Sequence, residues 1–151
     1  MIKAIFSIQD SQSIHAVSLH ESDSMQIEWE IDGSCSPLLQ KQIALWIEQY
    51  ESGNQPTVTL PLAARQVSPY TKKVLQELTK IPFGAKITYK QLAELSGNPS
   101  GSRAAGNACG RNPWPLIIPC HRVVGQKGLG GFSSGGVSVK ERLIAFELLK
   151  L

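Results

Sequence analysis

The chain has 151 residues, of which 42% are hydrophobic and 18% charged, a composition that can build a folded core and excludes a disordered protein. Its length suits one compact unit or two small domains. No apolar run approaches the roughly 20 residues of a membrane-spanning helix. Asp10 interrupts the apolar N-terminal stretch too early for a signal peptide. We therefore expect no contact with a membrane and a cytoplasmic location, or a nuclear one in a eukaryote.

The net charge of +3 is the sum of two unlike halves. Residues 1–60 carry two basic and eight acidic side chains, a net charge of −6. Residues 61–151 carry thirteen basic and four acidic side chains, a net charge of +9. Such asymmetry indicates that the basic half meets a polyanion.

The three cysteines, Cys35, Cys109 and Cys120, are odd in number and widely spaced. Together with three scattered histidines they match neither a disulfide framework nor the ligand spacing of a zinc site. We predict no metal. A reducing compartment is the natural environment, so each cysteine could be a working thiol.

The first sixty residues have the pattern of a small α/β domain, which we place at residues 1–62. Segments 2–8 and 14–19 are strand-like, and apolar residues alternate with polar ones over 25–31, as in a half-buried strand. Ser36 followed by Pro37 predicts a helix start, and Gly53 its end. The Gly- and Pro-containing stretch 52–61 is typical of a linker.

The second domain, placed at residues 66–151, opens with another Ser-Pro start at Ser68 and a helix that we extend to Pro82. Thr88 and Gln91 form a predicted capping box for a short helix to Leu95. Ser100 or Ser102 is then expected to cap a second short helix ending near Cys109. A Gly-rich loop, 125–136, and an amphipathic helix, 137–149, close the chain.

The two short helices predict a helix-turn-helix, and its second helix is unusual. Helices that read the major groove carry long polar side chains, whereas residues 102–109 are mostly Ala and Gly. A bare helix favours close approach to the minor groove with little sequence discrimination, and Arg103 is its one long cation. The alternative is a helix of small residues that simply packs against another helix. The charge of +9 favours DNA.

Cys120 lies in the sequence Pro119-Cys120-His121-Arg122. A free thiol has a pKa of about 8.5 and is a weak nucleophile until a base takes its proton. His121 is the candidate base, directly or through a water molecule, Arg122 could stabilise the thiolate, and Glu147 could orient His121. The alternative is a buried, inert cysteine beside a surface histidine. Cys35 and Cys109 have no adjacent base, so packing is their expected role.

The sequence Pro-Cys-His-Arg-Val-Val of residues 119–124 resembles the active-site signature of the O6-alkylguanine-DNA alkyltransferases. The match continues on both sides of Pro119–Val124, in the family's order and spacing, from about Ser68 to Leu149. Its other parts are Gly97-Asn98-Pro99, Arg103-Ala104-x-Gly106-x-Ala108, Asn112-Pro113, Gly131-Phe132-x-x-Gly135 and Val139-Lys140-x-x-Leu143-x-x-x-Glu147. The resemblance implies a ribonuclease H-like α/β N-terminal domain and a mostly α, winged-helix C-terminal domain with a helix-turn-helix.

The resemblance also implies a role for each matching residue in the chemistry. Cys120 would accept the alkyl group, and His121, held by Glu147, would activate it through a bound water. Asn112 would be the hinge that fixes the turn before the active-site segment. Tyr89 would lie near the extruded base and protonate the leaving guanine.

The residues implied in DNA and base binding lie around the second short helix and the Gly-rich loop. Arg103 would enter the base stack, with Ala104, Gly106 and Arg111 facing the DNA. The backbone of Val123 and Ser134 would read the guanine edge. Phe132 replaces the family's usual tyrosine, so ring stacking is retained and any hydroxyl role is lost.

The implied substrate is duplex DNA that contains O6-alkylguanine, and O4-alkylthymine is a further possible substrate. The protein would bind the minor groove as a monomer, flip the base out and keep the alkyl group irreversibly. No cofactor is implied, because the damaged DNA is the alkyl donor. The small residues of the Gly-rich loop favour a pocket that accepts bulky O6-benzylguanine.

Three alternatives remain at the level of sequence. The alkyltransferase-like proteins bind alkylated DNA without reacting, but they replace the acceptor cysteine that Cys120 retains here. A helix-turn-helix regulator would not need the segment around Cys120. A cysteine hydrolase would need an oxyanion site and repeated turnover.

Overall fold

The computed structural model describes residues 1–151, and alternating apolar residues form the central strand of its sheet. This strand, β1 (Ile2–Ile8), pairs antiparallel with β2 (Ile14–Glu21) and parallel with β3 (Glu28–Asp32), in the order β2-β1-β3. Successive side chains of a strand point to opposite faces, so every second residue of β1 enters the core. The buried ones are Ile2, Ala4, Phe6 and Ile8.

The third strand is shorter than the sequence pattern predicts. Its pairing with β1 begins at Glu28, and Met25 is 95% exposed. Ile27 is buried ahead of the strand. Alternation alone therefore placed the start of the strand too early, because the length of a strand is set by the residues it can pair with.

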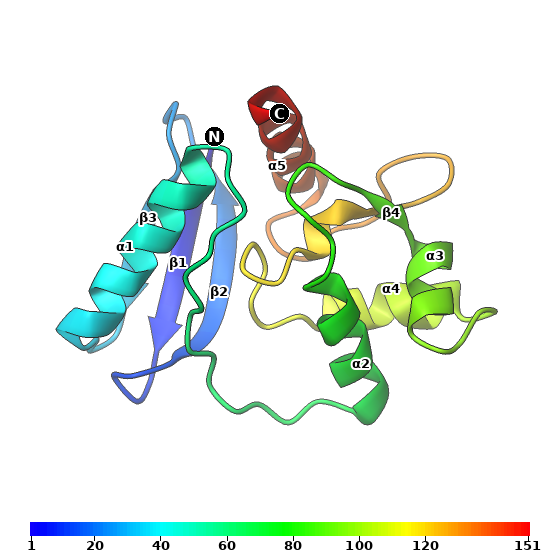
Figure 1. Cartoon of the computed structure of the whole chain (residues 1–151), viewed down its shortest axis with the longest axis horizontal. Coiled ribbons are helices and arrows are strands. Elements are labelled where there is room, and N and C mark those ends of the chain that lie inside the picture. The colour runs from blue at the N-terminus through cyan, green and yellow to red at the C-terminus, as the bar shows by residue number, and fades with distance from the viewer.

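Helix α1 (Pro37–Glu51) begins as predicted, with the Ser36 hydroxyl accepting the Leu39 N–H at 3.1 Å. It lies along the sheet (Figure 1) and buries one apolar face: Leu39, Ile43, Trp46, Ile47 and Tyr50. The following stretch, predicted as a linker, runs beside β2. Ile14 N–H donates to Pro61 O at 2.8 Å, and Ala63 N–H to Ile14 O at 2.9 Å.

Helix α2 (Pro69–Leu78) is capped by Ser68 as expected, but it ends before Pro82. After Leu78 the backbone tightens into turns in which Lys80 N–H binds Glu77 O and Ile81 N–H binds Leu78 O, both at 3.1 Å. The residue before a proline avoids helical geometry, so the helix has to finish earlier than the proline itself.

A short parallel pair, β4 (Ile87–Thr88) with β5 (Val123–Val124), joins the helix-turn-helix to the active-site segment. Helix α3 (Tyr89–Leu95) has the predicted capping box of Thr88 and Gln91, and it packs on α4 (Ser102–Gly110). The cap of α4 was predicted wrongly. Gly101 occupies the cap position without a side-chain bond, because Ser102 is already the first helical residue.

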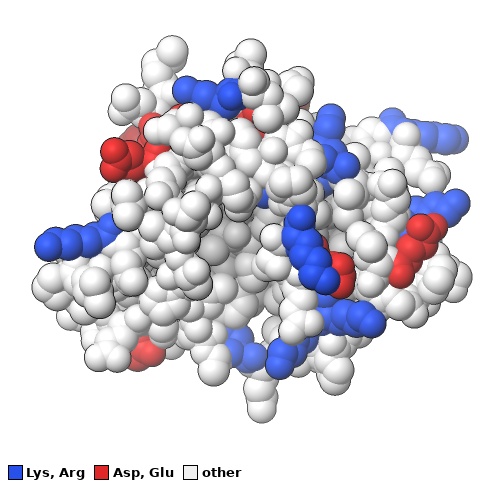
Figure 2. Space-filling model, in the orientation of Figure 1, with Lys and Arg blue, Asp and Glu red and all other residues white.

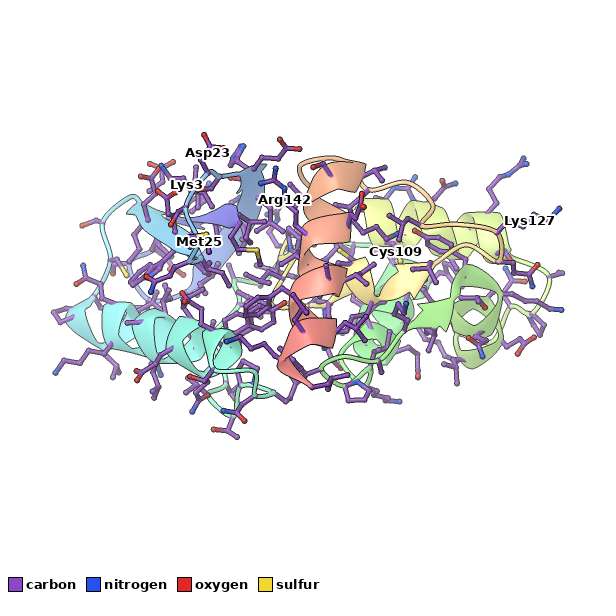
Figure 3. All side chains as sticks on the ribbon, turned by 90° about the horizontal axis from the view of Figure 1, so that it is seen from above. Lys3, Asp23, Met25, Cys109, Lys127 and Arg142 are labelled. Atoms are coloured by element: carbon purple, nitrogen blue, oxygen red, sulfur yellow. The ribbon has the colours of Figure 1, made fainter.

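Helix α5 (Val137–Lys150) stands between the two halves of the molecule and packs against β1, β2 and the 3₁₀ turn η1 (Cys120–Arg122). Figure 3 shows α1 and the sheet on one side of α5 and the helix-turn-helix on the other. The halves also share direct bonds: Val17 N–H donates to Pro113 O, and Trp114 Nε1–H to Ile14 O. None of the helices combines the length and the apolar character that crossing a membrane requires.

Candidate active site

Cys120 begins the 3₁₀ turn η1 and is 3% exposed. Its backbone N–H donates to Ile118 O at 2.8 Å, which turns the chain sharply after Pro119. Were this segment a strand, Cys120 and His121 would point to its opposite faces. The turn removes that difficulty, because both residues belong to one tight loop of backbone rather than to a strand.

Asn112 ties together the segment that carries Cys120. Its amide donates to Ile118 O, and its side-chain oxygen accepts the Trp114 N–H, both at 2.9 Å. Within this segment Leu116 is buried with φ of +75°, a left-handed conformation that side chains rarely adopt. The bonds of Asn112 therefore hold a strained backbone in place just before the thiol.

His121 is fully buried, and its two ring nitrogens lie in different environments. Nε2 lies 2.5 Å from Glu147 Oε2, whereas Nδ1 is buried and has no hydrogen-bond partner. Burial lowers the pKa of His121, although Glu147 opposes that shift, so the ring is neutral at pH 7. With Nε2–H donating to the carboxylate, Nδ1 keeps its lone pair and can accept a proton.

Glu147 on α5 is a buried carboxylate surrounded by donors. Oε2 accepts hydrogen bonds from His121 Nε2–H and from the Tyr50 hydroxyl, the latter at 2.6 Å. Oε1 accepts hydrogen bonds from Arg122 Nε–H at 2.8 Å and from Gly84 N–H at 2.9 Å. Burial alone would raise the pKa of Glu147, but the hydrogen bond from His121 and the bonds and charge of Arg122 outweigh it and bring the pKa to about 2. The carboxylate is therefore ionised at any physiological pH.

Arg122 does not serve the thiol, contrary to the expectation from its place in the sequence. Its guanidinium is buried, bonds to both oxygens of Glu147, and donates to Ile81 O at 2.7 Å. Residues 120 and 122 point in different directions on the 3₁₀ turn. Arg122 thus fixes the carboxylate that holds His121, and the thiolate must be stabilised by other groups.

Burial raises the pKa of the Cys120 thiol to about 11, and the side chain of Asn112, nearby backbone N–H groups and the charge of Lys140 oppose this increase. The resting thiol is therefore protonated at pH 7 and needs a base before it can attack. Lys140 is itself buried on α5, and desolvation lowers its pKa. It supplies the cation that sequence reasoning assigned to Arg122.

These residues occupy a region that matches a known protein family. The family model described as 6-O-methylguanine DNA methyltransferase, DNA binding domain, matches residues 69–149. The chain belongs to this methyltransferase family. The match contains every residue of the buried site except Tyr50.

Curated members of the methyltransferase family extend the likeness. The methylated-DNA–protein-cysteine methyltransferase of Rattus norvegicus is 42% identical over 123 residues, which are 77% of this chain and 58% of the rat protein. The protein of that name from Archaeoglobus fulgidus is 40% identical over 70% of this chain and 74% of its own length. This chain thus spans less than two thirds of the rat protein.

Among solved structures, Mycobacterium tuberculosis OGT in complex with DNA has a TM-score of 0.74 and 27% identity. The alignment covers 99% of this chain and 93% of the other. The fold of the methyltransferase family therefore extends through the N-terminal half, where the family model does not reach.

In this family member, the residues that the resemblance placed at DNA lie on and beside α4. Arg103 and Arg111 are exposed at the start and just past the end of the helix, and Ala104 is half-buried. Gly106 faces the Tyr89 ring, which a Cβ there would approach to 3.7 Å. Ala105, Ala108 and Cys109 pack inward. The small residues thus pack against the interior on one face of α4 and leave its other face without long side chains.

The basic charge of this half is not all on the surface. On the face in Figure 2, Lys and Arg side chains lie mainly over the half that contains α2, α3 and α4. Arg122 and Lys140, however, are 2% and 0% exposed, and Arg122 is paired with Glu147. The charge available to a polyanion is therefore smaller than the +9 counted from the sequence.

Tyr89 lies apart from the Glu147 network, beside the Gly-rich loop. Its hydroxyl accepts a bond from Lys140 Nζ at 3.1 Å and lies 3.4 Å from Gly131 O. Lys140 also donates to Leu129 O and Gly131 O, so one buried lysine joins the loop to Tyr89. A cleft of about 420 Å³ opens there, lined by Tyr89, Lys90, Ser102, Gly125, Gln126 and Lys127. Cys120 does not line this cleft.

The remaining predicted base-binding residues are dispersed. Val123 is buried in β5, and its N–H already binds Cys120 O. Phe132 is half-buried against the hydrophobic core, and Ser134 is half-buried in the same loop. The structure therefore brings together Cys120, His121, Glu147 and Asn112, and Phe132 and Ser134 lie in the Gly-rich loop outside this group.

Sequence reasoning missed Tyr50 and gave Lys140 no role. Lys140 is part of the family pattern, so its position was marked although its contacts were not. Tyr50 gave no signal, since it lies 97 residues from the carboxylate that it binds.

Proposed function

We propose that this protein repairs DNA by moving the alkyl group of O6-alkylguanine onto Cys120. The observation that carries the proposal is the buried thiol beside a neutral His121 whose Nδ1 is free and whose Nε2 is held by ionised Glu147. A protonated thiol with a neutral imidazole next to it is activated only when a substrate arrives. Membership of the methyltransferase family supports the same reaction.

The reaction is an in-line displacement at the alkyl carbon. Sγ of Cys120 attacks this carbon, the bond from carbon to guanine O6 breaks, and the thiol proton passes to His121 through a water molecule at Nδ1. The departing guanine takes a proton from the Tyr89 hydroxyl, whose pKa burial and the nearby Cys109 and Cys120 raise to about 12, so that it stays protonated. The thioether product has no good leaving group, so each molecule acts once.

The target base reaches the buried thiol only by leaving the duplex. Extrusion costs a few kcal/mol of unstacking. Arg103 on α4 fills the space left in the stack, while the bare surface around Ala104 and Gly106 lies in the minor groove, and Arg111 contacts the backbone.

We also propose the domain boundaries, the oligomeric state and the location of the protein. Residues 1–62 form a ribonuclease H-like domain, and residues 66–151 a winged-helix domain with the helix-turn-helix. The protein acts as a monomer, without a cofactor, in the cytoplasm or in a eukaryotic nucleus. The carbonyl of Val123 and the backbone of Ser134 read the guanine edge.

The competing role is a protein that binds alkylated DNA without reacting. Cys120 argues against it, because a pure binder needs neither an acceptor thiol nor a buried base. The buried Nδ1 of His121, which has no hydrogen-bond partner, would have no purpose in such a protein, whereas it can accept a proton in a reacting one.

One assay tests the proposal. The protein is incubated with duplex DNA that contains a labelled O6-methylguanine, and the label bound per protein molecule is counted. We expect transfer to saturate at one label per molecule and to vanish in Cys120→Ala. Cys109→Ala is the matched control, because Cys109 is also buried but has no histidine next to it in the sequence. Repeated turnover, or binding of the DNA without transfer of the label, would contradict the proposal.

A further inference from the structure

Tyr50 reaches the candidate active site from the other half of the molecule. It lies in the last turn of α1, is fully buried, and donates its hydroxyl proton to Glu147 Oε2 at 2.6 Å. The same oxygen lies 2.5 Å from His121 Nε2. The carboxylate that orients the base is therefore shared between a residue of the N-terminal half and the histidine.

The ring of Tyr50 is held by aromatic neighbours on three sides. It stacks on Trp46 at 5.4 Å between ring centroids, stacks on Phe146 at 5.4 Å, and meets Phe83 edge-on at 5.3 Å. Phe146 precedes Glu147 on α5, and Phe83 precedes Gly84, whose N–H binds Glu147 Oε1. The ring thus packs against the two segments that carry the carboxylate and one of its other donors.

The hydroxyl is fixed as a donor. Burial and the neighbouring Glu147 carboxylate raise the pKa of Tyr50 well above its usual range, so it stays protonated. A short bond to a charged acceptor is worth more than a neutral one, and it withdraws negative charge from Oε2. Without it, more of that charge would act on His121 and favour its protonated form.

We infer that Tyr50 is a positioning residue for the Glu147–His121 pair, so that the N-terminal half contributes directly to the alkyl-transfer site. The inference rests on the proposed function for its effect on rate, but the contact can be measured on its own. The charged groups that face His121 are Glu147 and Lys140 from α5 and Arg122 from its own turn. Tyr50 bonds the first of these and makes no hydrogen bond to the histidine itself.

The chain offers a matched control in Tyr70. Its hydroxyl is also buried, yet it has no hydrogen-bond partner. Tyr50→Phe and Tyr70→Phe each remove one buried oxygen and keep the ring, so both variants are expected to fold, and thermal unfolding verifies this. Only Tyr50→Phe removes a donor from Glu147.

The rate of single-turnover transfer is measured against pH for the wild type and both variants. We expect Tyr50→Phe to lower the plateau rate about tenfold, as loss of one hydrogen bond to a charged group would. Its acid limb should shift to higher pH, because His121 becomes easier to protonate. Tyr70→Phe should match the wild type. In a Glu147→Gln background, Tyr50→Phe should add no further loss.

A wild-type plateau and an unshifted acid limb in Tyr50→Phe would overturn the inference, and so would an equal effect of Tyr70→Phe. NMR titration of the His121 ring separates this failure from that of the proposed function. If the wild type transfers no label, the proposed function fails, while a higher His121 pKa in Tyr50→Phe than in the wild type still supports the positioning role. An unchanged His121 pKa contradicts it.

Discussion

The site around Cys120 and the surface of α4 are built in opposite ways. The first is dry, and nearly every polar atom in it has a partner, as the five hydrogen bonds to Glu147 show. The second is open, with exposed Arg103 and Arg111 set among small residues. The chemistry requires fixed geometry and a controlled proton, whereas a DNA surface that tolerates any sequence requires only charge and close approach.

The difference also decides how each region responds to a mutation. In the buried site a lost side chain leaves partners unsatisfied, so both stability and reactivity suffer. On the exposed surface a lost side chain is replaced by water, so only the DNA binding that we propose for this surface suffers. Mutations in the two regions should therefore have separable effects on stability, reaction rate and DNA binding.

Replacing His121 by Ala should have the largest effect on reaction rate. The thiol, whose pKa is about 11, would then lack a base, and general-base catalysis contributes roughly 10²–10⁴-fold. The single-turnover rate with O6-methylguanine DNA measures the loss. His20→Ala is the control, since His20 is exposed on β2 and should keep the wild-type rate. A variant that still reacts at the wild-type rate would show that another group takes the proton.

Replacing Glu147 by Ala should destabilise the fold more than any surface change. Arg122 would remain buried without its partner, and removing one member of a buried ion pair costs about 3–5 kcal/mol. Urea unfolding measures the free energy. Glu141→Ala, on the exposed face of the same helix, should change it by less than about 0.5 kcal/mol. Equal effects of the two changes would mean that the buried bonds contribute little.

The same kind of contrast separates the elements that local sequence patterns predict correctly from those that they miss. The strands β1 and β2, the Ser36 and Ser68 caps and the capping box of α3 are set by neighbours within a few residues, so local patterns predicted them. The start of β3 depends on pairing with β1, and local patterns missed it. The end of α2 and the cap of α4 were missed by a few residues for similar reasons.

Within the site, adjacency in sequence was a partial guide. Cys120, His121 and Asn112 lie within ten residues of one another, and the family resemblance added Glu147. Arg122 was assigned to the wrong partner because sequence order does not give the direction of a side chain on a 3₁₀ turn. Tyr50 could not be found at all, since its contact depends on how α1 packs against α5.

Replacing Arg103 by Ala should affect the reaction on duplex DNA but not on a free base. Without the inserted side chain the extruded nucleotide returns to the stack more readily, so we expect the rate on duplex DNA to fall about tenfold. The rate with free O6-benzylguanine should not change, because no extrusion is needed. Lys41→Ala removes an exposed charge from α1 and should leave both rates intact. Equal losses on both substrates would place Arg103 in the chemistry instead.

The smallest expected effect is the pH dependence of stability that His121 creates. Burial lowers its pKa in the folded protein, so as pH falls below about 6.5 the unfolded chain binds a proton that the folded protein does not. Stability should therefore decrease from pH 7.5 to 5.5 by about 1 kcal/mol more in the wild type than in His121→Gln.

Glu147 does not contribute to the change of stability over this pH range. Its pKa is about 2 in the folded protein, so the stability that it contributes is lost only as pH falls below its ordinary value of 4.5. Urea unfolding at the two pH values measures the difference, and Arg103→Ala should keep the wild-type dependence because its side chain lies in water. If His121→Gln shows the same decrease as the wild type, the histidine is not held neutral, and the proton acceptor at Cys120 has to be sought elsewhere.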